Sequence, residues 1–208
     1  AARRCMRYRR YATLFAVGAT GCSEITFQML TIVGFQVLFG YLYLRITLII
    51  ASFMIGLAAG TWLILKNLNK IKEPFLVFRH VQAAILLYPF LLAAALGAMS
   101  RMPPEVVRSE AGGIIFSCMP FIAGFAGGIQ FPVAGRVCLQ GGGDVGLTAG
   151  MCYAVDLIGA GLGAFVMCIY VIPVFGLYGA VAGIILLNLS ALMLLYFAGA
   201  PVSEAHAC

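Results

Sequence analysis

The chain has 208 residues, of which 63% are hydrophobic and 10% are charged, and its mean hydropathy is +1.05. Soluble domains contain about 45–50% apolar and about 25% charged residues, so this composition excludes a water-soluble enzyme, a disordered tail, a collagen-like fibre and a secreted disulfide module. The 13 lysines and arginines exceed the 7 acidic residues, and five of them lie in the first ten residues. Basic residues before an apolar run indicate a membrane-anchoring flank rather than a nucleic-acid-binding surface.

Six apolar segments are long enough to cross the hydrocarbon core of a membrane as helices, which takes about 20 residues. In chain order they cover residues 11–33, 43–65, 75–98, 111–134, 145–170 and 177–198. Their continuous Leu, Ile, Ala and Gly runs lack the alternation of a membrane β-barrel. Pro173 and Gly176 interrupt the last long apolar stretch, which predicts a tight turn between two spans. The predicted fold is therefore all-α, a polytopic integral membrane bundle of about six transmembrane helices.

The basic residues are distributed unequally between the two sides of the predicted membrane. With the N-terminus inside, three of the 13 flank the outer side (Arg45, Arg101 and Arg108) and ten flank the inner side: Arg3, Arg4, Arg7, Arg9, Arg10, Lys66, Lys70, Lys72, Arg79 and Arg136. The positive-inside rule then predicts that both termini are cytoplasmic. We expect a basic cytoplasmic flank over residues 1–10, a six-helix domain over 11–199 and a short cytoplasmic tail over 200–208.

Glycines recur at a spacing of four in four of the predicted spans. The pairs are Gly56 and Gly60, Gly124 and Gly128, Gly159 and Gly163, and Gly179 and Gly183. Each pair puts two small residues on one helix face, which lets helix backbones approach closely in a membrane. The strings around Gly159 and Gly141 resemble nucleotide-binding turns but lack the preceding strand that such a site requires. We therefore interpret the glycine pairs as helix-packing positions in a tight bundle.

Two acidic residues inside the predicted spans are the strongest functional signal. Glu24 lies about 13 residues into the first span, on a helix face with Gln28, and Asp156 lies at a similar depth in the fifth span. An unpaired carboxylate at mid-membrane costs a few kcal/mol or more. The two acids could share a proton, a cation or a substrate ammonium group. Alternatively, each accepts hydrogen bonds from neighbouring groups and only fixes helix packing.

The remaining polar residues carry less information. Arg79 and His80 lie at the inner mouth of the third span and are candidate interface or ligand residues. Gln36, Gln130 and Asn188 are expected to form hydrogen bonds between helices. The seven cysteines have no metal-site or haem-attachment spacing, and the two histidines cannot complete a catalytic triad or a zinc-protease motif. We expect no cofactor, no metal and no catalytic constellation in this chain.

Several short stretches resemble one family of bacterial membrane proteins. They are residues 35–43 (FQVLFGYLY), residues 51–60 (ASFMIGLAAG), Phe131 with Pro132, residues 153–160 (YAVDLIGA), and Pro173 with Gly176. This ordered set resembles the membrane-embedded, spermidine-synthase-like proteins. In that family a major-facilitator-like helical region is commonly fused to a soluble aminopropyltransferase-like domain. The resemblance implies that Glu24 corresponds to the family's glutamate in a hydrophobic run and Asp156 to its Tyr-x-x-Asp position.

The resemblance covers the membrane part only, because the predicted loops leave no room for a synthase domain. The first functional hypothesis is a noncatalytic anchor or assembly subunit of a larger complex in the bacterial inner membrane. A second is a half-transporter for a polyamine, another organic cation or a proton, completed by a second bundle. A third is the membrane part of an aminopropyltransferase whose catalytic domain lies elsewhere. The expected partners are the lipid bilayer and other protein subunits, with a polyamine as a possible ligand and no nucleic acid.

Overall fold

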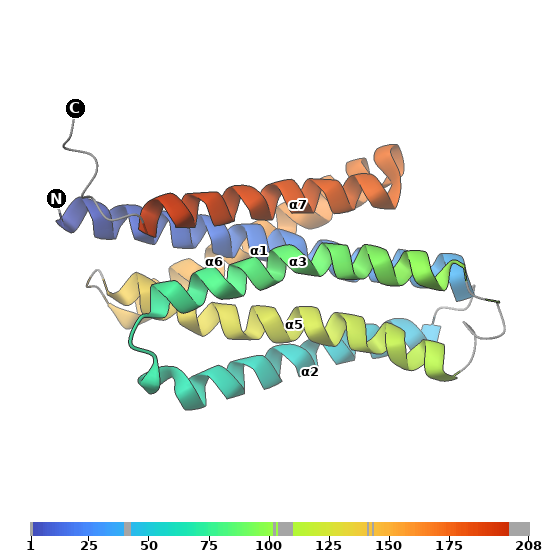
Figure 1. The fold of residues 1–208 in the computed structure, drawn as a ribbon, viewed down its shortest axis with the longest axis horizontal. Helices are drawn as coiled ribbons and strands as arrows, with labels where there is room; N and C mark the ends of the chain where they lie inside the picture. The colour runs from blue at the N-terminus through green and yellow to red at the C-terminus, as the bar shows by residue number, and fades with distance from the viewer. Residues whose placement is uncertain are drawn as a thin grey trace.

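The computed structural model of the protein describes residues 2–39, 43–101, 103, 110–140, 142 and 144–199. These residues form six α-helices and no strand (Figure 1): α1 (Ala2–Phe39), α2 (Tyr43–Asn67), α3 (Pro74–Met99), α5 (Glu110–Leu139), α6 (Val145–Val166) and α7 (Ile172–Gly199). A short 3-10 helix, Leu68–Lys70, follows α2, and a π-helical turn, Met167–Val171, joins α6 to α7. The prediction of an all-α fold is confirmed. Arg108 and the predicted tail over residues 200–208 lie outside the described residues.

Four helical stretches among the described residues are long and apolar enough to cross a membrane. They are Ile46–Asn67, Pro74–Met99, Ser117–Leu139 and Val145–Gly199, the last of which contains both α6 and α7. Helix α1 is not one of the four. The count of six spans and the cytoplasmic position of the termini therefore stay predictions. The predicted flank over residues 1–10 is largely helical, because α1 begins at Ala2.

Helix α1 is less apolar because it lies at the centre of the bundle, where it contacts every other helix of the described part. Five of its hydroxyl side chains are at most 4% exposed: Thr13, Thr20, Ser23, Thr26 and Thr31. Each donates a hydrogen bond to the backbone carbonyl four residues earlier, over 2.7 to 3.0 Å. Such bonds satisfy a polar group that would be costly to expose to lipid. The polar face of α1 is thus directed into protein.

Glycines mediate the close contact between α2 and α5. A methyl group on Gly56 or Gly60 would overlap the backbone of α5, at Phe121 and Phe125 respectively. In the same way, a methyl group on Gly124 or Gly128 would overlap the backbone of α2, at Phe53 and Leu57. These four glycines therefore allow the two helices to pack backbone against backbone, and Thr61 on α2 also donates a hydrogen bond of 3.0 Å to the carbonyl of Gly128.

The other two glycine pairs differ from each other. Gly159 and Gly163 on α6 face the backbone of α1, at Gly18 and Cys22. In contrast, Gly179 and Gly183 face the side chains of Phe175 and Met167, near the junction of α6 and α7. Close backbone packing is therefore found at three of the four pairs that the sequence singles out.

The chain reverses direction at Gly176, so that α7 runs back antiparallel to α6 (Figure 1). The φ of Gly176 is 71° and its ψ is −173°. Residues with a Cβ rarely adopt this conformation, which is nearly specific to glycine. The sequence predicts a turn at this position, from Pro173 and Gly176.

The beginning of α1 and the end of α7 lie at the same end of the bundle (Figure 1). Nε of Arg9 donates a hydrogen bond of 3.1 Å to the carbonyl of Ala198, and its guanidinium lies 4.8 Å from the ring centre of Phe75. Arg136 donates to the carbonyl of Leu68 at this end. The structure thus gathers at one end the helix termini that carry the basic residues of the predicted inner side.

Candidate functional site

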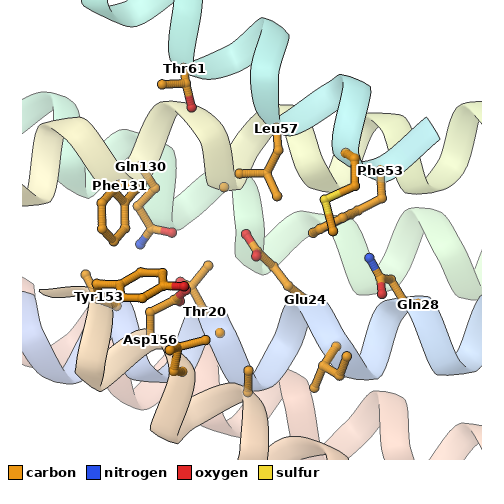
Figure 2. A pocket seen from close by; sticks show the side chains of 17 residues that line it. Thr20, Glu24, Gln28, Phe53, Leu57, Thr61, Gln130, Phe131, Tyr153 and Asp156 are labelled. Carbon is orange, nitrogen blue, oxygen red and sulfur yellow. The ribbon is translucent and has the colours of Figure 1, made fainter. Parts of the chain in front are cut away.

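A cavity of about 490 Å³ lies between α1, α2, α5 and α6 (Figure 2). All four helices contribute polar residues to its lining, and α2 contributes Thr61. The polar side chains that line it are Thr20, Glu24, Gln28, Thr61, Gln130, Tyr153 and Asp156. Apolar side chains complete the wall: Val17, Ile25, Phe53, Met54, Leu57, Phe131, Leu157 and Ala160. The cavity therefore combines a polar region with an apolar lining inside the helical bundle.

Both predicted membrane carboxyls lie in this cavity, together with Gln28 (Figure 2). The carboxyl of Glu24, on α1, lies against Gly127 of α5, where any β-carbon would overlap it. Asp156, on α6, lies against Gly21 of α1, where a β-carbon would overlap the backbone oxygen of Asp156 and would be 2.7 Å from its Oδ1. Each acid therefore occupies space that a glycine on the neighbouring helix leaves free.

Among the described residues, the cavity is lined by acidic residues without basic ones. Within the described part of the chain, neither Glu24 nor Asp156 accepts a hydrogen bond from a side chain or a backbone amide. Both residues are half-buried and line the cavity, so their carboxyls are open to the cavity rather than enclosed by donors of the protein. The geometry therefore favours a site whose positive or donor groups come from a ligand.

Four polar residues of the cavity lining are not predicted from the sequence: Thr20, Thr61, Gln130 and Tyr153. Tyr153 precedes Asp156 by three residues, a spacing that puts both on one helix face. Thr20 likewise precedes Glu24 by four. These spacings are a signal that could have identified both residues from the sequence. Gln130 and Thr61 carried no comparable signal, because their inclusion depends on which helices are neighbours.

Behind the cavity, four buried polar side chains connect four helices. Nε2 of Gln130 donates to Oε1 of Gln82 over 2.6 Å, and Nε2 of Gln82 donates to Oδ1 of Asn188 over 3.0 Å. Nδ2 of Asn188 then donates to Oγ of Ser23 over 2.6 Å. We call this set, Gln130, Gln82, Asn188 and Ser23, the amide chain. The expected hydrogen bonds of Gln130 and Asn188 between helices are confirmed. Gln36 is exposed, and its side chain makes no such bond to another described residue.

Arg79 and His80 do not lie in the cavity. The guanidinium of Arg79 is 5.7 Å from the ring centre of Tyr196 on α7. His80 is exposed, and its Nδ1 lies 2.8 Å from the backbone carbonyl oxygen of Leu76 on the same helix. The structure therefore separates these two candidates from Glu24, Gln28 and Asp156, and places them at the basic end of α3.

Among the described residues, no three His, Cys, Asp or Glu side chains are grouped in a way that could hold a metal ion. The cavity instead offers two carboxyls and several neutral polar groups. Such a set suits a ligand that brings positive charge or N–H donors. No family model, curated protein or solved structure matches the chain.

Proposed function

We propose that this chain binds an organic cation in the cavity between α1, α2, α5 and α6 and moves it as half of a membrane transporter. One observation carries the proposal: Glu24 and Asp156 enter one cavity from different helices, with no basic lining residue among those described. Four helical stretches long and apolar enough to cross a membrane support a site at membrane depth. The proposed location is the bacterial inner membrane, with both termini cytoplasmic.

The cavity brings two carboxyls together inside the helical bundle, where the dielectric constant is low. Ionised carboxylates in the membrane are costly unless they are paired, and like charges in one cavity add repulsion. A protonated amine offsets both costs, because it supplies positive charge and several N–H donors. A proton shared between the two acids offsets part of these two costs. Cations therefore bind here in preference to neutral or anionic solutes.

The shape of the cavity suits a ligand with an apolar portion. Its volume of about 490 Å³ lies in the range of small-molecule sites, about 300–1,000 Å³. The wall residues Met54, Tyr153 and Leu157 are 57%, 57% and 52% exposed, so the cavity is open on the side between α2 and α6. Phe53 and Phe131 can cover methylene groups while the carboxyls hold the charged nitrogen. An alkylamine or polyamine has this combination of features.

The family resemblance guides the choice of ligand. Residues 153–160, which include Tyr153 and Asp156, resemble the Tyr-x-x-Asp region of the spermidine-synthase-like proteins. Spermidine is therefore the first cation to test. A noncatalytic anchor of a larger complex, or the membrane part of an aminopropyltransferase with its catalytic domain elsewhere, would require neither carboxyl in a cavity. The geometry is why we place cation binding before these two roles.

The experiment is uptake of labelled spermidine into vesicles that contain the purified chain at a density high enough for two copies to supply both halves of the transporter. We expect uptake by the unmodified protein and its loss in Glu24→Gln and in Asp156→Asn. Glu73→Gln is a matched control, because Glu73 is exposed at the start of α3 and its side chain caps no helix amide. Uptake that is unchanged in both cavity variants would show that the carboxyls do not carry a transported cation.

A further inference from the structure

We infer that Gln130 supplies a third acceptor to the cavity and makes the site selective for cations that carry N–H groups. The inference rests on the proposed function and narrows its substrate class. A protonated primary or secondary amine would bind more tightly than a quaternary ammonium with the same alkyl chain. The geometry that leads to this specificity lies in the amide chain behind the cavity.

The first observation is an unpaired acceptor. Gln130 is 2% exposed and lines the cavity. Its Oε1 is the one buried side-chain N or O atom in the described part of the chain that has no hydrogen-bond partner. In Figure 2 this amide oxygen is directed toward the side of the cavity that Glu24 occupies. Buried polar groups are nearly always paired, so an orphan acceptor at a cavity wall indicates a donor that arrives with a ligand.

The second observation is that the amide chain fixes which end of the Gln130 amide faces the cavity. The hydroxyl of Ser23 donates to the carbonyl of Ala19 over 2.7 Å, so its oxygen is free to accept from Asn188. Nδ2 of Asn188 also donates to the carbonyl of Ile184 over 3.0 Å. Both contacts require the amino group of Asn188 at that position. Its oxygen must then face Gln82, which sets the next amide.

The orientation of the Gln82 amide in turn fixes the orientation of the Gln130 amide. Gln82 uses its amino group on Asn188, so it presents its Oε1 to Gln130. Reversing the Gln130 amide would bring two carbonyl oxygens together where a hydrogen bond of 2.6 Å now exists. Gln130 therefore keeps its amino group in the chain and its oxygen at the cavity.

The cavity thus presents acceptors from three helices: Glu24 from α1, Gln130 from α5 and Asp156 from α6. Charge alone attracts any cation to the two carboxyls. An N–H group is needed in addition to pair the oxygen of Gln130. A site with a buried hydrogen-bonding group discriminates strongly against a ligand that leaves this group unpaired. A quaternary ammonium has no N–H and leaves it unpaired.

The test is calorimetric titration of the purified chain in detergent with two probes, n-butylammonium and n-butyltrimethylammonium. We expect the unmodified protein to prefer n-butylammonium by at least about tenfold, since hydrogen bonds to charged groups are stronger than neutral ones. In Gln130→Leu the preference should fall to near equality. Thr31→Val is the control, because it removes a buried hydroxyl of α1 that bonds only within its own helix. This variant should keep the preference.

A second variant covers the case in which Gln130→Leu does not fold. Asn188→Ala leaves the cavity wall intact but frees the amide of Gln82 to rotate, and we expect it to reduce the preference severalfold. Equal binding of both probes to the unmodified protein, or full preference retained in Gln130→Leu, would overturn the role of Gln130 while leaving the cation site in place. Binding of neither probe would contradict the cation site itself, and with it this inference.

Discussion

The carboxyl of Glu24 on α1 lies directly against Gly127 on α5, in space that a single methyl group would fill. The three atoms nearest to a β-carbon at Gly127 would all belong to the carboxyl group of Glu24. The position of the Glu24 carboxyl therefore depends on Gly127 having no side chain. This dependence allows the position of the carboxyl to be changed with little effect on the helices.

Gly127→Ala should weaken cation binding without unfolding the protein. The new methyl group displaces a flexible side chain rather than a helix, so the Glu24 carboxyl moves and the bundle remains. We expect affinity for spermidine to fall about tenfold, which corresponds to about 1.4 kcal/mol. Calorimetric titration measures the affinity and thermal unfolding in detergent measures the fold. Gly135→Ala on the same helix is the control, because a β-carbon there meets no atom within 4 Å. If both variants bind equally well, the carboxyl position is irrelevant to binding.

Gly159→Ala and Gly161→Ala should have opposite effects on stability, although both residues lie on α6. A methyl group at Gly159 would overlap the backbone of Gly18 on α1, whereas one at Gly161 meets nothing within 4 Å. Overpacking of this kind costs about 1–3 kcal/mol, while Ala in an open helical position is favoured over Gly by about 0.5–1 kcal/mol. Thermal unfolding of the two variants should differ accordingly. Equal midpoints would contradict the close approach of α1 and α6.

Gly176→Ala should destabilise the reversal between α6 and α7. The φ of 71° and ψ of −173° at Gly176 are strained for a residue with a Cβ, at a cost of about 1–3 kcal/mol. The control is Gly150→Ala, at a helical position with no atom near the added carbon. A lower unfolding temperature in Gly176→Ala alone is the expected result. An unchanged temperature would show that the chain continues through this position as a regular helix.

Asn188→Ala should destabilise the bundle through the amide chain. The variant leaves Nε2 of Gln82 and Oγ of Ser23 without their partners, and a buried unpaired group costs about 1–3 kcal/mol. Ser190→Ala is a neighbouring control, because Ser190 is exposed and bonds only to the carbonyl of Leu187. Denaturation in detergent should give a lower free energy of unfolding for Asn188→Ala than for Ser190→Ala. A matching loss in both would mean that the amide chain contributes nothing specific.

The sequence predicts the helices well because each apolar run is long and its interruptions are sharp, as at Pro173 and Gly176. It also predicts the two acids of the site, since a carboxyl among apolar residues stands out by composition alone. It does not predict that Gly127 makes room for Glu24, or that Gln130 joins the same wall. Those relations depend on which helices are neighbours, and α1 and α5 are distant in the chain. The polar residues of α1 make this helix less apolar, but the sequence does not show that the other helices surround it.

The central claim is that Glu24 and Asp156 together hold an organic cation. The most direct measurement is equilibrium binding of spermidine to the purified chain in detergent, since it does not depend on transport or on a partner subunit. We predict saturable binding to the unmodified protein and to Glu73→Gln, and no measurable binding to the double variant with Glu24→Gln and Asp156→Asn. Saturable binding that survives in a folded double variant would contradict the claim.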